Sequence, residues 1–132
     1  MVELLEIRDD VGVKTGNIDF SGKIVINGNV TNGYSINSDD EIVINGIVEG
    51  AVISTKGNLF INGGIQGHDK AQITVGGNMI SKFINNAHIT CHGNIEADAI
   101  MHSTIMCDGS IHVRGKKALI VGGDIKDRKS VV

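Results

Sequence analysis

The two cysteines are the residues of this chain whose side chains are most able to do covalent chemistry. Cys91 and Cys107 end two similar segments, Ile89-Thr90-Cys91 and Ile105-Met106-Cys107, about sixteen residues apart. If these segments stack as neighbouring parallel strands, their Cα atoms lie about 4.8 Å apart, which a disulfide permits. Side chains in parallel register run side by side, however, and this makes the required dihedral angle awkward. We therefore expect two buried, reduced thiols that behave as small apolar groups and react slowly.

Histidines are the next candidates, because imidazoles bind metals and move protons. His88, His92, His102 and His112 lie in the second half of the chain, in segments whose pattern predicts strands and turns. A metal centre needs ligands that converge, and strands with this spacing spread the four side chains apart. We expect His92 to stack over Asp108 as an exposed pair. No zinc motif of paired cysteines and no Ser/His/Asp set is visible, so we predict no metal, no cofactor and no catalytic residues.

Asparagine next to glycine recurs along the chain, at Asn27-Gly28, Asn45-Gly46 and Asn62-Gly63. Further asparagines follow glycines of other predicted turns, namely Asn17, Asn58, Asn78 and Asn94. Ladders of these polar groups could bind a ligand, but a structural role is favoured. Asparagine tolerates turn geometry and stacked amides can bond to one another, while glycine accepts left-handed backbone. The glycine-rich stretch 63–67 lacks the lysine and the following helix of a phosphate-binding loop.

These residues belong to a repeat of about sixteen residues that has the form glycine-polar-aliphatic-x-aliphatic. Its copies begin at Gly22, Asp40, Gly57, Gly77, Gly93, Gly109 and Gly123. Within each copy, aliphatic residues alternate with polar ones, which is typical of a strand with one buried face. A fixed repeat made of strands predicts a β-solenoid, in which coils stack and bury a shared core. The chain has 18 glycines and no proline, as a continuous ladder with many turns requires.

Stacking the copies places like residues over like in five inward-facing columns. The first is Ile24, Ile42, Leu59, Met79, Ile95, Ile111 and Ile125. The second is Ile26, Ile44, Ile61, Ser81, Ala97 and Val113. The third is Val30, Val48, Ile65, Ile84 and Ile100. The fourth is Ile18, Ile36, Ile53, Ile73, Ile89, Ile105 and Leu119. The fifth is Phe20, Ser38, Thr55, Val75, Cys91, Cys107 and Val121. We predict a right-handed, single-stranded parallel β-helix of about six coils, each about 16–18 residues long.

Three parts of the chain depart from the repeat. Residues 1–14 are expected to cap the first coil or to be a remnant of a preceding domain, residues 15–125 to form the solenoid, and residues 126–132 a charged tail. Charge on the last strand edge discourages the addition of further strands. The segment Arg114-Gly115-Lys116-Lys117 is expected to form a shortened turn.

The remaining departure is an insertion at residues 66–72, which we expect to bulge from the rod as a surface loop. Gln66, His68, Asp69 and Lys70 are the candidate residues for contact with a partner. Loops carried by a rigid scaffold are frequent binding sites.

Composition excludes several classes of function. A net charge of −3 opposes binding to nucleic acid, which needs clustered Lys and Arg, and 3% aromatic residues leave few surfaces for stacking bases. No apolar run approaches the roughly 20 residues of a membrane span, and no signal peptide is visible. We therefore expect a cytoplasmic protein with no nucleic-acid partner and no membrane insertion.

With its repeats laid out, the chain resembles the β-solenoid region of flagellar assembly protein A (FapA), a bacterial family. The motifs behind the resemblance cover roughly residues 11–125, and they are Gly22–Val30, Gly63–Gly67, Gly77–Ala87, Ile100–Ile105 and Ile120–Gly123. The resemblance implies a right-handed β-helix, no known catalytic residues, and a role in flagellar assembly or placement through protein contacts. The N-terminal domain and the C-terminal helical coiled coil of the family's usual pattern are not in this sequence.

Two functions remain open at this point. The first is a non-catalytic interaction scaffold of the FapA kind, present as a monomer or small homo-oligomer. The alternative is a self-assembling filament module similar to bactofilins. An enzyme is the least favoured class, because a rod this narrow is filled by its own core.

Overall fold

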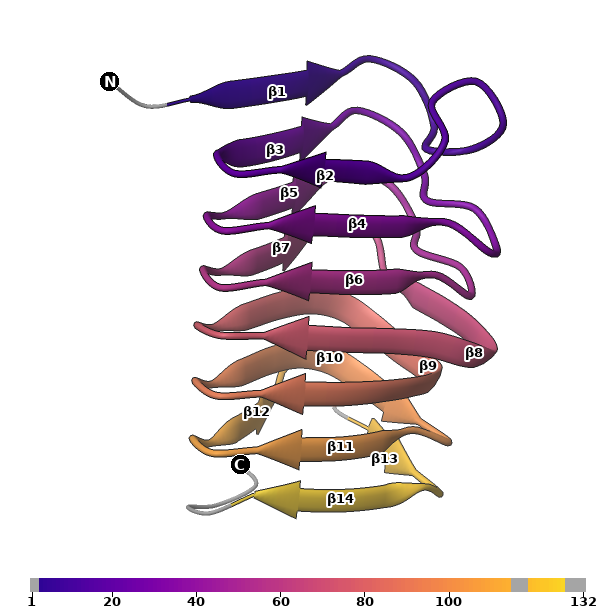
Figure 1. Cartoon of the computed structure of the whole chain (residues 1–132). Coiled ribbons are helices and arrows are strands. Elements are labelled where there is room, and N and C mark those ends of the chain that lie inside the picture. Colours follow the sequence, from indigo (N-terminus) through magenta and orange to yellow (C-terminus); the bar gives the residue numbers. More distant parts are fainter. Residues whose placement is uncertain (1–2, 115–118, 128–132) are drawn as a thin grey trace.

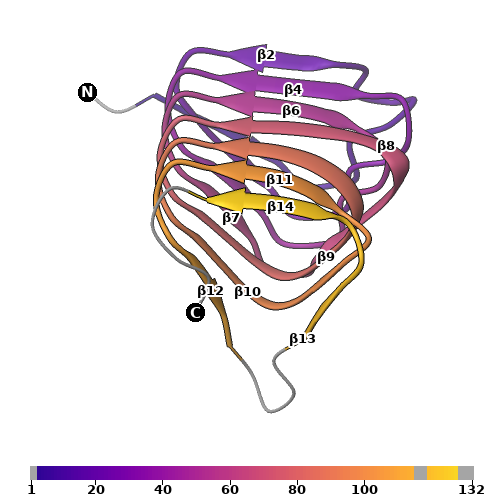
Figure 2. The ribbon, with the colours of Figure 1, turned by 90° about the horizontal axis from the view of Figure 1, so that it is seen from below.

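The computed structural model describes residues 3–114 and 119–127, which form strands and turns without a helix. Fourteen strands pair in parallel as one sheet that winds into stacked coils. Figures 1 and 2 show that the chain descends the stack with a right-handed turn, the hand that parallel crossover connections prefer. The predicted all-β parallel solenoid is therefore confirmed, with about seven coils rather than about six.

Each coil has three sides, which we name A, B and C in the order in which the chain passes through them (Figure 2). Side A is formed by β1 (Leu4–Ile7), β3 (Lys23–Ile26), β5 (Ile42–Ile44), β7 (Leu59–Ile61), the first part of β9 (Met79–Cys91), the first part of β10 (Ile95–Met101) and β12 (Ile111–Val113). Side C is formed by β2 (Ile18–Phe20), β4 (Ser35–Ser38), β6 (Val52–Thr55), the last parts of β8 (Ile65–Val75) and β9, β11 (Thr104–Cys107) and β14 (Asp124–Asp127).

Side B changes along the rod. Its first coils are joined only by single bridges between Val11, Val30, Val48 and Ile65. Its later coils are continuous strands from β8, β9 and β10, followed by β13 (Leu119–Val121). The corner between sides A and B is therefore a smooth bend within β9 and β10, whereas the earlier coils turn sharply there at Asn-Gly pairs.

The core is the set of inward columns that the repeat predicts. Ile24, Ile42, Leu59, Met79, Ile95 and Ile111 of the first column are fully buried, and neighbours in this column are paired in register. The β-branched side chains suit this environment because they pack well on a pleated, buried surface. A column at the corner between sides B and C lay outside the prediction. It consists of the small buried residues Ala51, Ala71, Ala87 and Ser103.

The register predicted for the last coil is wrong. Ile125 pairs with Ile105 on side C instead of extending the first column. Leu119 and Val121 pair with Ala99 and Met101 on side B instead of joining the fourth and fifth columns. The cause is the Gly-Gly pair at residues 122–123, which resembles the pair at 76–77 but occupies a different corner. Gly122 and Gly123 have φ of 64° and 82° and lie against His102 and Ser103. The last coil is not shortened, because Thr104 pairs with Asp124, 20 positions later, whereas His88 pairs with Thr104, 16 positions later. The expected tight turn at 114–117 lies mostly outside the described residues.

At the other end, residues 4–7 of the segment expected as a cap form β1, which pairs in register with β3. Leu5 and Ile7 stand in the first and second columns and are half-buried. This part of the segment therefore continues the parallel ladder. The charged tail proposed at 126–132 is described only for Lys126 and Asp127, at the end of β14.

Candidate interaction surfaces

The asparagines at the corners accept hydrogen bonds from the backbone of the next coil. The Oδ1 atoms of Asn58, Asn78 and Asn94 accept the N–H groups of Asn78, Asn94 and Ser110 at 2.8–2.9 Å. Asn29 and Asn32 do the same at other corners, for the N–H groups of Ile47 and Gly50. Backbone N–H groups at turns need acceptors when the strand ladder does not supply them. The oxygens of these amides are thus used in bonds that hold neighbouring coils together.

A second ladder joins amide side chains directly, as the sequence predicted. Asn45 donates from Nδ2 to Oδ1 of Asn27 at 2.7 Å, and Asn62 donates in the same way to Asn45. The ladder ends at Asn62, because the next two residues at this position on side A are Lys82 and Asp98. At this position, side A therefore changes from neutral amides to charged groups in the later coils.

Close approach between coils, and not left-handed backbone, requires most of the turn glycines. A Cβ added at Gly93 would lie 2.3 Å from Oδ1 of Asn78 and 2.5 Å from the carbonyl oxygen of Gly77. Gly109 has the equivalent contacts with Asn94 and Gly93. Neither glycine is among the residues with positive φ, in contrast to Gly16 and Gly33. The expectation that turn glycines mainly supply left-handed geometry is therefore wrong at these corners.

The fifth column supplies hydroxyl and thiol donors to turn carbonyls. Ser38 donates from Oγ to the carbonyl oxygen of Gly22 at 2.5 Å, and Thr55 donates in the same way to Asp40. In later coils the thiols take this role: Cys91 donates from Sγ to Gly77 at 3.2 Å, and Cys107 donates to Gly93 at 3.1 Å. The sequence predicted the column but not its bonds, although its exchange of Ser, Thr and Cys was a signal for a shared donor.

The two cysteines are reduced and buried, as expected. Burial raises the pKa of the Cys91 thiol to about 12, against a backbone hydrogen bond from Gly93 that lowers it. The neighbouring Cys107 raises that pKa further. Because the thiolate is the reactive form of cysteine, Cys91 is a poor nucleophile in the folded protein.

The histidines do not converge. His92 pairs with Asp108 through Nδ1 and Oδ2 at 2.8 Å, and both side chains are exposed, as predicted. His88 lies on side C, His112 on side A, and His102 at the corner between sides B and C. Within residues 3–114 and 119–127, no three His, Cys, Asp or Glu side chains are placed to hold a metal ion.

The predicted loop is an irregularity within β8. Gln66 pairs with Asn85 and Ala71 with Ala87, so four residues of β8, 67–70, lie opposite the single residue Asn86 of β9. His68 and Asp69 have φ of 52° and 60°, and consecutive positive φ values are typical of a tight type I′ turn.

The four candidate contact residues differ in accessibility. His68, Asp69 and Lys70 are exposed at the tip of the loop, and Gln66 is half-buried at its base. Among the described residues, Oε1 of Gln66 has no hydrogen-bond partner. Ala71 and Gly67 are buried, so the surface loop itself is 68–70.

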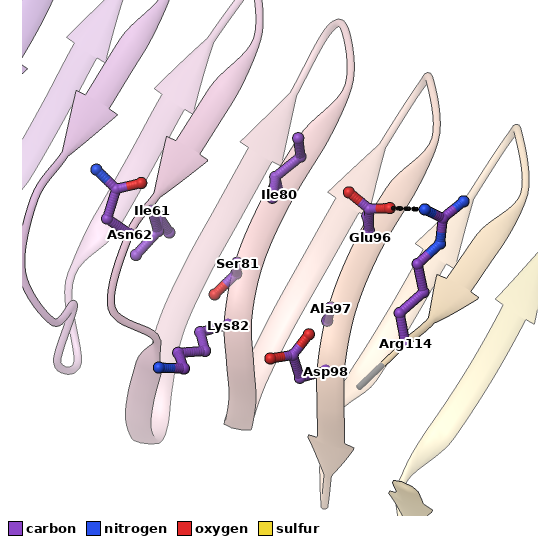
Figure 3. A pocket seen from close by; sticks show the side chains of 9 residues that line it. All are labelled: Ile61, Asn62, Ile80, Ser81, Lys82, Glu96, Ala97, Asp98 and Arg114. Atoms are coloured by element: carbon purple, nitrogen blue, oxygen red, sulfur yellow. Dashed lines mark ion pairs between the residues drawn. The ribbon is translucent and has the colours of Figure 1, made fainter. Parts of the chain in front are cut away.

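Side A carries a shallow depression of about 360 Å³ between its later strands (Figure 3). Ile80, which is 42% exposed, and Glu96 lie on its rim, and the Glu96 carboxylate pairs with Arg114 at 3.0 Å. Lys82 and Asp98 project from neighbouring strands and form no ion pair within the described part of the chain. Sequence analysis did not single out this surface, and the depression includes none of the loop residues 66–70.

Stacked parallel coils with a filled core and side chains arranged in ladders define a β-solenoid repeat protein. Within residues 3–114 and 119–127, no element is a helix capable of crossing a membrane. A comparison with protein families matches residues 3–132 to the flagellar assembly protein A β-solenoid domain. The chain belongs to this family. No curated protein and no solved structure gives a significant match.

Proposed function

We propose that this protein is a non-catalytic scaffold of the bacterial cytoplasm that binds protein partners in flagellar assembly or placement. The observation that carries the proposal is the family match over nearly the whole chain. The architecture supports it, because a rod stabilised by contacts between neighbouring coils presents long, fixed side surfaces. The asparagine side chains that recur along the rod are used in bonds between coils. The net charge of −3 favours proteins over nucleic acid as partners.

The loop at 68–70 is the contact region that we propose. His68, Asp69 and Lys70 present an imidazole, a carboxylate and an ammonium group beyond the surface of the coils. Their backbone follows a tight turn anchored by the buried residues Gly67 and Ala71. A loop of defined shape loses little conformational entropy on binding, which favours its use as a recognition element.

Capture from a lysate of a flagellated bacterium tests this function. The protein serves as bait beside a loop variant, in which His68, Asp69 and Lys70 are all replaced by Ala, and a control variant on side C. The control replaces Thr74, His88 and Thr90 by Ala, which are also exposed. We expect flagellar assembly proteins, identified by mass spectrometry, to bind the bait and the control and to be lost with the loop variant. Binding that is equal for all three would contradict the loop assignment, and an absence of flagellar proteins would contradict the function.

We propose that the protein is a monomer or small closed oligomer, since charged side chains on β14, such as Asp124 and Lys126, oppose strand addition. Light scattering over a concentration series should give a constant small mass. A mass that grows without limit in physiological salt would instead support the filament class.

A further inference from the structure

Cys91 and Cys107 are direct register partners on adjacent parallel strands. β9 and β11 pair from His88 with Thr104 to Cys91 with Cys107, without a bulge between them. Neighbouring parallel strands lie about 4.8 Å apart, and a disulfide needs Cα atoms 4.4–6.8 Å apart. The Cα spacing therefore permits a bond between these coils, and the dihedral angle about the sulfur atoms is the remaining geometric requirement.

The two cysteines differ in their chemistry from the other members of their column that donate to turn carbonyls. Ser38 and Thr55 occupy the same position in earlier coils and satisfy turn carbonyls with hydroxyl groups. A hydroxyl would therefore be sufficient for the fold at positions 91 and 107. The chain instead places its only two cysteines at register-paired positions of consecutive coils. Serine, threonine and cysteine all satisfy a turn carbonyl in this column, and of the three only cysteine can also form a covalent bond between coils.

We propose that Cys91 and Cys107 form an oxidation-dependent disulfide that fastens two successive coils of the rod. The oxidant is a small-molecule disulfide. One cysteine thiolate attacks it, releases one small thiol and forms a mixed disulfide. The second cysteine thiolate then attacks the sulfur of the first cysteine and releases the other small thiol. The two protein thiols lose two protons and two electrons, and the small disulfide is reduced to two thiols.

The fold controls when this reaction proceeds. Cys91 and Cys107 are 1% and 3% exposed, so a soluble disulfide does not reach them while the coils are closed. Burial also keeps Cys91 in the thiol form at neutral pH. Reaction requires that the later coils open locally, which proteins do with free energies below that of global unfolding. The bond then closes the loop of one coil and restricts further opening.

Oxidation by glutathione disulfide tests the proposal. The protein is incubated with it at several urea concentrations below the unfolding midpoint, alkylated, and measured by mass spectrometry and thermal melting. We expect a monomer that has lost about 2 Da, a Cys91–Cys107 linked peptide, and a rate that rises with urea. The melting temperature should rise by about 5–10 °C and return after reduction.

The variants Cys91→Ser and Cys107→Ser provide matched controls, because serine already fills the same position at Ser38. Each should fold, keep its melting temperature after exposure to glutathione disulfide, and form no intramolecular bond. The proposal is overturned if the wild-type protein yields only glutathione adducts, only linked dimers, or two alkylated thiols. A linked protein whose melting temperature is unchanged or lower would overturn the fastening role.

Discussion

At the scale of single residues, the corners of the coils decide whether the stack holds. Strand interiors satisfy their backbone groups through the parallel ladder, but turns do not. Here side chains at the corners supply the missing partners: Asn78 accepts from the next coil, and Cys91 donates to the carbonyl oxygen of Gly77. Each of these bonds needs the coils to approach closely, which explains why glycine stands beside the asparagine at positions 77 and 93.

Truncation of a core side chain should be costly. Ile44 is fully buried and lies in the second column. Ile44→Ala should lower the free energy of unfolding by about 2–5 kcal/mol, through lost burial and the cavity that remains. Val52→Ala is the control, since Val52 is 48% exposed on side C and its truncation should cost less than about 0.5 kcal/mol. Urea denaturation measures both, and equal effects would contradict the observed register.

Two glycine substitutions should distinguish a glycine that is required by close contact between coils from one that is required by its backbone conformation. Gly93→Ala inserts a Cβ 2.3 Å from Oδ1 of Asn78 and should cost about 3 kcal/mol or more, because backbone of the preceding coil must shift. Gly16→Ala meets no atom within 4 Å and should cost only about 1–2 kcal/mol, for its φ of 66°. Urea denaturation of the two variants measures the loss of stability in each. A smaller loss at Gly93 than at Gly16 would show that the coils can separate at little cost.

At the scale of elements, side B is where the coils differ. β8 and β9 pass around the corner from side B to side C as continuous strands, and the insertion in β8 is accommodated there without disturbing the pairs on either side. The columns of buried isoleucine and alanine before and after the loop keep their register. An insertion at this corner therefore alters the surface and leaves the core unchanged.

Deletion of His68–Lys70 should be tolerated. It leaves Gly67 alone opposite Asn86 and makes this coil match its neighbour in length. Asn86 has φ of 53°, a conformation that glycine also accepts. We expect cooperative unfolding and a free energy change below about 1 kcal/mol, because loop closure depends weakly on length. Deletion of His68–Ala71 is the comparison, and it should be much more damaging because it also removes the buried Ala71.

The sequence predicted elements better than corners, for a physical reason. Burial every second residue leaves a clear pattern, so columns such as Ile42 and Leu59 could be aligned correctly. A turn leaves a weaker pattern, because a glycine pair can fit more than one corner, and this misplaced Ile125. The depression on side A depends on how Ile80 and Glu96 project from neighbouring strands, and no short motif encodes that arrangement. The loop at 68–70 could be found because it interrupts the repeat.

At the scale of the whole molecule, the fold is held together by contacts between neighbouring coils. Each described strand pairs with strands of the coil directly before it, directly after it, or both, so stability is the sum of similar interfaces between neighbours. A FapA-family scaffold of this kind can hold contact groups at fixed intervals of about 4.8 Å along its side surfaces. One position on side A, which holds Asn27, Asn45, Asn62, Lys82 and Asp98 in successive coils, shows how substitutions change the surface chemistry of a level while the strands keep their register.

The side-chain bonds between successive coils also determine how the rod responds to force. They join residues 14–20 positions apart, and like the strand ladder they connect one coil to the next. Tension applied through the two termini should therefore unfold the coils one at a time, beginning at an end of the rod. Each release should lengthen the tether by about 50–65 Å, the extended span of one coil. Optical tweezers would resolve such steps, whereas a single long extension would mean that the coils yield together.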